Sequence, residues 1–249
     1  MATTATRQPV APPLLLGAAV LVGWEAISRV GLVPEFFLPP PSAVATRLVA
    51  DLGSGLLGYV VPTLVEAVLG CLLGAAVALP LGYLVFRSRH AAAALDPFLA
   101  ASQALPAVAV APLLMLWVGY GLIPIVILCA LLVFFPIVLT TVLGLRGLDP
   151  DVREAALLDG ADHWEMLRHI EAPLALPALL TGLRNGFTLS VTGAVVGEFV
   201  MGGRGLGMLV ASRADSTDTA GLFVALALLV ALAMSVYGLL GTLQRRSEN

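Results

Sequence analysis

Apolar residues gather in six long runs along the chain, and short polar stretches separate them. Each run is close to the roughly 20 apolar residues that a helix needs to cross the hydrocarbon layer of a membrane. The pattern therefore predicts an all-α, polytopic membrane protein with six transmembrane helices. The runs lie at about residues 10–30, 60–86, 95–118, 122–145, 175–200 and 220–243.

The connection between the first two runs contains three consecutive prolines at 39–41, which cannot be helical. Ser42 follows and is suited to cap a short helix that extends to Asp51. We expect this helix to lie on the outer surface of the membrane. The chain accordingly divides into residues 1–58, with the first span and the outer helix, and residues 59–249, with the transmembrane core.

Glycines recur at a spacing of four in the second and fifth runs. This small-xxx-small spacing lets two helix backbones approach closely in lipid, so these faces should pack against protein. The spacing leaves open whether the neighbour belongs to the same subunit or to a second copy. The residues are Gly70, Gly74, Gly182, Gly186, Gly193 and Gly197.

The arginines are distributed unequally between the two sides that the six runs define. With the N-terminus inside, eight of the thirteen arginines lie on the cytoplasmic side and four on the outer side, which the positive-inside rule favours. Both termini are therefore predicted to be cytoplasmic. The inner group is Arg7, Arg87, Arg89, Arg146, Arg153, Arg168, Arg245 and Arg246, and the outer group is Arg29, Arg47, Arg204 and Arg213.

Composition narrows the functions that are open to the chain. With 59% hydrophobic and 12% charged residues, it is too apolar for a soluble domain. All thirteen basic residues are arginines, so the chain lacks the lysine that a Walker A loop places on nucleotide phosphates. A net charge of −3 without a basic stripe argues against binding of nucleic acid. The histidines have poor metal-ligand spacing, and the serines at 180–220 have no nearby histidine base, so the sequence predicts no metal site and no catalytic residues.

One long polar and charged stretch, residues 149–173, interrupts this apolar chain. Asp149 before a proline predicts the start of a short helix that ends near Leu158. Gly160 suits a left-handed turn, and Asp162 with Glu165 forms a capping-box pattern that begins a second helix. We expect Pro173 to stop that second helix, which gives a compact hairpin.

Such a hairpin either lies on the bilayer or docks in a groove of another protein. Seven acidic residues in the stretch oppose only Arg153 and Arg168, and an anionic inner leaflet repels such a segment. The charge therefore favours a protein partner with a basic rim.

Within this stretch Glu154, Ala155, Ala156, Gly160, Ile170 and Pro173 reproduce the EAA signature, except that Ala172 stands where leucine is common. The chain thus resembles the membrane permease subunits of ABC importers, in the branch that imports nitrate, sulfonates, taurine and thiamine-precursor pyrimidines. The resemblance covers about residues 37–245. Further matching segments are FLPPPSAV at 37–44, LDPFL at 95–99, LPAVAVAPLLMLWVGYG at 105–121, GLR at 182–184 and GEFVMGGRGLG at 197–207.

This resemblance implies the type I ABC importer fold, with a transmembrane type-1 core over residues 59–249. It also implies a bacterial inner-membrane permease that pairs with a second copy of itself, two ATPase subunits and an extracytoplasmic substrate-binding protein. ATP and Mg²⁺ would bind to the partner ATPase, and this chain would hold no cofactor. The residues expected to couple to the ATPase are Glu154, Ala155, Ala156, Asp159, Gly160, Trp164, Ile170 and Pro173.

Polar residues inside the runs are candidates for the solute pathway, because such groups are costly in a membrane. We select Gln103, Arg184, Asn185 and Glu198. Arg184 either meets an anionic solute or pairs with an acidic group of the coupling region, and Glu198 either accepts backbone amides of the following glycine-rich loop or lines the pathway. Glu66, less than two turns into its run, is more easily explained by packing or snorkelling.

Two other functions remain as alternatives. A secondary transporter usually carries paired repeats and midplane acids, and we find no convincing repeat and no deep acidic cluster. An integral-membrane transferase or hydrolase would need the nucleophile-base or metal sets that the sequence lacks. The small polar solute of an ABC importer is therefore the favoured cargo.

Overall fold

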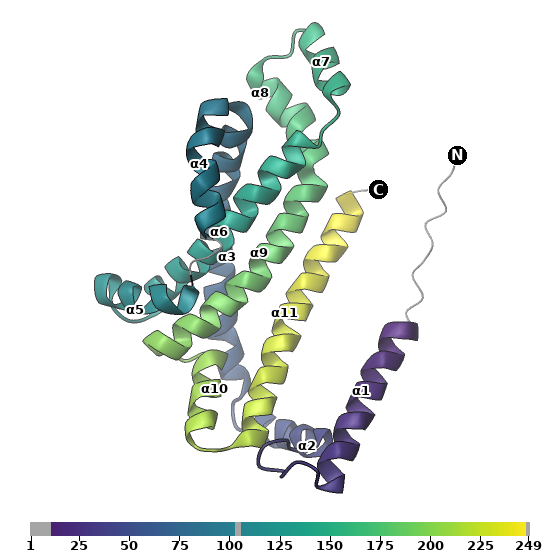
Figure 1. The fold of residues 1–249 in the computed structure, drawn as a ribbon, viewed down its shortest axis with the longest axis vertical. Helices are drawn as coiled ribbons and strands as arrows, with labels where there is room; N and C mark the ends of the chain where they lie inside the picture. The colour runs from purple at the N-terminus through teal and green to yellow at the C-terminus, as the bar shows by residue number, and fades with distance from the viewer. Residues whose placement is uncertain (1–10, 103–105, 248–249) are drawn as a thin grey trace.

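A computed structural model describes residues 11–102 and 106–247 of the chain, and in these ranges the regular elements are helices. Figure 1 shows an elongated bundle in which α7 and α8 lie at one end and α2 and α10 at the other. The helices in chain order are α1 Ala11–Val30, α2 Pro41–Leu52, α3 Leu57–Arg87, α4 Arg89–Ser102, α5 Ala107–Val118, α6 Leu122–Arg146, α7 Pro150–Leu158, α8 His163–Met166, the π-helical turn η1 Leu167–Glu171, α9 Ala172–Met201, α10 Leu206–Asp215 and α11 Thr219–Ser247.

Three described helices are long and apolar enough to cross a membrane, namely α3, α6 and the Thr219–Thr242 part of α11. A fourth span results if α9, with the short helix before it, and α10 are taken together across a 49° bend. α1 occupies the first predicted run. The all-α membrane fold predicted from the apolar runs is confirmed.

The third predicted run, residues 95–118, is not one helix. α4 ends at Ser102 and α5 begins at Ala107, after Pro106 in an extended conformation. A proline has no N–H to donate into a helix and clashes with the carbonyl four residues earlier, so a break near this position is favourable. Because the run is apolar throughout most of its length, its composition did not indicate that the helix is interrupted.

Two expected helix ends are also different in the structure. α2 begins at Pro41, and Ser42 does not cap it; Ser42 instead donates from its backbone N–H and its hydroxyl to the Glu25 carboxylate, at 3.1 and 2.8 Å. Pro173 does not stop the second hairpin helix. The Ala172 N–H donates to Leu167 O, five residues earlier, and this wide turn makes room for the proline ring, so the helix continues into α9.

The glycines of α3 and α9 pack against α6 within the same chain, which answers the question that their spacing left open. A Cβ atom at Gly74 would lie 2.9 Å from the Ala130 backbone oxygen, and one at Gly193 would lie 3.0 Å from the Cys129 Cα. The Ser190 hydroxyl donates to Ala67 O at 2.7 Å across the same seam. These close contacts hold α3, α6 and α9 as one block.

Candidate functional site

The hairpin at residues 149–173 forms from short-range hydrogen bonds. Asp149 accepts from the Asp151 N–H at 3.0 Å, and Gly160 makes the turn with a φ of +88°. Asp162 accepts from the Trp164 and Glu165 amides at 2.8 and 2.7 Å, and the Glu165 carboxylate accepts from the Asp162 N–H. The predicted helix start, turn and capping box are confirmed.

A hollow of about 490 Å³ lies in the bend of the hairpin. Four members of the predicted coupling set line it, and the remaining four, Glu154, Ala155, Trp164 and Pro173, are exposed around it. The hairpin therefore presents a concave surface to its surroundings. The lining residues are Ala156, Asp159, Gly160, Ala161, Glu165, His169 and Ile170.

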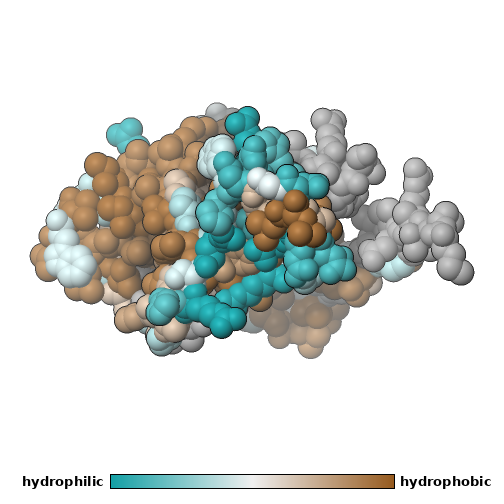
Figure 2. Space-filling model, turned by 90° about the horizontal axis from the view of Figure 1, so that it is seen from above, coloured by the Kyte–Doolittle hydropathy of each residue, from teal (hydrophilic) through white to brown (hydrophobic). Residues whose placement is uncertain are grey.

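Apolar side chains project beside this hollow. Leu158 is 88% exposed and Trp164 is 64% exposed, and Leu157 is also exposed. Six acidic residues of the hairpin are exposed as well. Figure 2 looks down on this end of the molecule and shows hydrophilic side chains around a small apolar patch. Apolar anchors within a charged rim are typical of a protein-binding surface.

The base of the hairpin is tied to the membrane helices. The Arg153 Nε lies 3.1 Å from an oxygen of the fully buried Glu171 carboxylate, and its guanidinium group lies over the Phe86 ring. Arg87 Nη2 is 2.6 Å from His163 Nδ1. Sequence reasoning counted Glu171 among the exposed acids and missed this pair. These contacts fasten the base of the hairpin to α3 and to the helical turn that leads into α9.

At the opposite end, the Glu198 carboxylate is fully buried and caps the N-terminus of α10. It accepts from the Thr63 hydroxyl at 2.6 Å and from the backbone amides of Gly207 and Met208. Thr63 Oγ1 in turn accepts from the Leu206 N–H at 2.7 Å. A side chain at Gly205 or Gly207 would overlap this carboxylate. The predicted contact between Glu198 and the glycine-rich loop is confirmed.

The four predicted pathway residues do not form one cluster. Arg184 lies fourteen positions before Glu198 on α9, about 21 Å along a helix axis. Its guanidinium group stacks over the Tyr237 ring of α11 at 4.0 Å, and Asn185 is exposed beside it. Gln103 lies outside the described residues. Sequence reasoning also undervalued Glu66, which is buried with its carboxyl group within hydrogen-bonding reach of Glu198.

Comparison with known proteins settles the family. Residues 67–248 match the family described as the inner membrane component of binding-protein-dependent transport systems. The chain belongs to this family. It is thus a permease subunit of an ABC importer, an integral protein of the bacterial inner membrane that forms the pathway for a small solute delivered by a binding protein, and ATP hydrolysis takes place in a separate subunit.

Relatives of the permease are named for the transport of several different solutes. It is 46% identical to the riboflavin transport system permease protein of Chloroflexus aurantiacus, over 91% of this chain and 85% of the relative. It is 33% identical to the formylaminopyrimidine transport permease of Halalkalibacterium halodurans, over 92% and 89%. It is 31% identical to the putative aliphatic sulfonates transport permease of Bacillus subtilis, over 83% and 75%. The predicted branch is confirmed.

Solved structures confirm the type I importer fold of the permease. An inward-facing methionine ABC transporter matches with a TM-score of 0.72 at 20% identity, covering 79% of this chain and 98% of that one. An amino acid ABC transporter matches with a TM-score of 0.66 at 17% identity, covering 80% and 96%.

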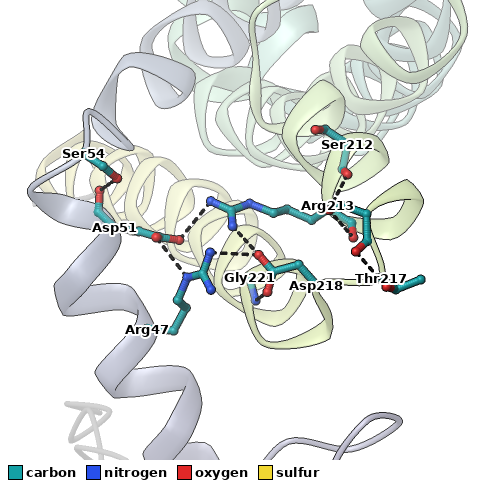
Figure 3. Close-up of polar contacts among 9 residues, drawn as sticks. Arg47, Asp51, Ser54, Ser212, Arg213, Thr217, Asp218 and Gly221 are labelled. Atoms are coloured by element: carbon teal, nitrogen blue, oxygen red, sulfur yellow. Dashed lines mark hydrogen bonds and ion pairs between the residues drawn. The ribbon is translucent and has the colours of Figure 1, made fainter.

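Four charged residues join three segments of the permease at the end that carries α2 and α10. Arg47 and Arg213 each contact both Asp51 and Asp218, as Figure 3 shows. Burial opposes ionisation of Asp218, but the Gly221 N–H and the two guanidinium groups outweigh it, so the pKa of Asp218 lies below its ordinary value of 3.8. The alternating charges hold α2 against the turn between α10 and α11.

The stability that this network contributes should depend on pH. Because the folded-state pKa of Asp218 is depressed, its contribution to stability is present above pH 3.8 and is lost as pH falls through the folded-state pKa. We expect Asp218→Asn to lower the free energy of unfolding by about 1 kcal/mol at neutral pH. Thermal unfolding of both proteins in detergent should show the difference shrinking below pH 3.8, and a difference independent of pH would contradict the assignment.

Proposed function

We propose that the permease works as a homodimer in which each copy docks its hairpin in a cleft of one of two ATPase subunits. The observation that supports this most is the exposed hairpin, whose hollow and apolar anchors have no covering among the described residues. The residues proposed for docking are Glu154, Ala155, Ala156, Asp159, Gly160, Trp164, Ile170 and Pro173. ATP and Mg²⁺ would bind to the ATPase, and the permease would hold no cofactor of its own.

The orientation that we propose has the hairpin and both termini in the cytoplasm. α11 runs back toward the end that carries the hairpin, so its C-terminal end and the hairpin lie on the same side in Figure 1. The charged network of α2, α10 and the following turn then faces outward, where a solute-loaded binding protein would dock.

For the solute, we propose riboflavin or a related planar heterocycle. This proposal is supported by the relative from Chloroflexus aurantiacus, which is named for riboflavin transport and is 46% identical over 85% of its length. The relatives named for sulfonates and taurine are 31% and 27% identical. A formylaminopyrimidine, the cargo named for another relative, is also a planar nitrogen heterocycle.

Reconstitution tests this proposal. The permease is co-expressed with a partner ATPase and binding protein, its subunit composition is weighed by native mass spectrometry, and riboflavin uptake into proteoliposomes is measured. We expect two permeases and two ATPases, with uptake that needs ATP and is blocked by vanadate. Uptake driven by an ion gradient and unaffected by vanadate would indicate a secondary transporter, and one permease copy per complex would refute the homodimer.

A further inference from the structure

A cavity of about 510 Å³ lies between α3, the start of α6 and the loop from α9 to α10. This volume is in the range of small-molecule sites, which are apolar with a few well-placed polar groups. Its walls are mainly apolar, and its polar side chains are Glu66 and Arg204. The lining residues are Val61, Pro62, Val65, Glu66, Gly121, Leu122, Ile125, Gly203 and Arg204.

Glu66 is only 5% exposed, and its buried Oε2 atom has no hydrogen-bond partner among the described residues. An unpaired acceptor buried in this way costs free energy and therefore calls for a donor. The neighbouring Glu198 carboxylate does not lack donors, because three donor groups of the protein already hydrogen-bond to it. Glu66 is thus the buried acceptor available in the wall of this cavity.

Two carboxyl groups in hydrogen-bonding contact need one proton between them, because a carboxylate has no donor. Since Glu198 already accepts three hydrogen bonds, Glu66 is the group that donates to it. Glu66 then offers a neutral carbonyl oxygen rather than a negative charge. Arg204, exposed at the mouth of the cavity, is a donor.

We propose that this cavity is a solute site on the transport pathway, a proposal that rests on the proposed function. The site takes the uncharged N–H and C=O edge of a planar heterocycle. The solute N–H donates to Glu66, and its carbonyl oxygen accepts from Arg204. The apolar walls formed by Val65, Leu122 and Ile125 cover the ring. Taurine and similar small ions gain little from such walls and would leave most of the cavity unfilled.

The test uses the reconstituted complex of permease, ATPase and binding protein, with riboflavin and taurine as separate probes. Glu66→Met removes the acceptor and should raise the KM for riboflavin uptake about tenfold, because the solute N–H is then left unpaired. Glu66→Gln should restore most of this loss, since its amide can donate to Glu198 while its carbonyl accepts from the solute. Val65→Trp, which fills the cavity without altering Glu66, should also raise the KM.

The matched control is Val77→Trp, at an exposed position farther along the same helix, which should leave uptake as in the native complex. If the native complex takes up riboflavin and both Glu66→Met and Val65→Trp match it, the proposed site is wrong and the proposed function stands. If Glu66→Gln is as defective as Glu66→Met, the site recognises charge and the inference fails. Uptake of taurine in place of riboflavin by the native complex would overturn both the site chemistry and the proposed solute.

Discussion

Replacing Trp164 with alanine should release the ATPase from the permease. Trp164 is 64% exposed beside the hollow of the hairpin, and tryptophan is among the residues that contribute most to protein interfaces. Truncating such an anchor typically costs about 2–4 kcal/mol, which weakens binding by roughly 30- to 900-fold. Co-purification of the ATPase through a tag on the permease should fall to background, and ATP-dependent uptake should be lost.

Trp117 provides the matched control. It lies on α5, away from the hairpin, and is 71% exposed, so Trp117→Ala makes the same chemical change at a surface outside the proposed contact. This variant should retain the ATPase. Equal retention by the two variants would refute the docking surface, and equal loss would point to a general effect of removing an exposed tryptophan.

Replacing Glu198 with alanine should destabilise the end of the permease that carries α10. The change leaves the Thr63 hydroxyl and the Gly207 and Met208 amides without their acceptor. The Thr63 hydroxyl can still donate to Tyr59 O, but each amide left unpaired costs about 1 kcal/mol or more, so a loss of at least about 2 kcal/mol is expected. The midpoint of thermal unfolding in detergent should fall, and amide exchange should accelerate first in α10.

Glu198→Gln gives a graded comparison, because its amide oxygen can still accept from one or two of these donors. Glu35→Ala, at an exposed position, should unfold like the native chain. If Glu198→Ala were as stable as Glu35→Ala, the carboxylate would not be the cap that the contacts indicate. A loss of transport with unchanged stability would instead favour a direct role of Glu198 in the pathway.

The parts of the molecule that short-range patterns control could be predicted from sequence. The hairpin is defined by Asp149, Gly160 and the Asp162 and Glu165 pair, each of which acts within three or four residues of itself. The long apolar runs located the long helices for a similar reason, since the length of a spanning helix follows from the thickness of the membrane. Such local signals need no knowledge of the tertiary structure.

The failures involve contacts between distant segments. Glu66 and Glu198 lie on different helices, and no spacing in the sequence indicates that their carboxyl groups meet. Glu171 looked like one more acid of the hairpin, but Arg153 pairs with it in a buried position. Pro173 has the usual character of a helix stop, yet the wide turn before it removes the clash that would have ended the helix.

The π-helical turn has a mechanical consequence. Because residues His163–Met201 form one continuous helical rod, the hairpin end and the α10 end of the permease share a single lever. Its 39 residues span roughly 58 Å at 1.5 Å per residue. A pivot at the glycine seam would convert a tilt of about 5° into a displacement of several ångströms shared between its two tips. With the ATPase docked as proposed, a small movement of the hairpin would therefore be felt at the α10 end.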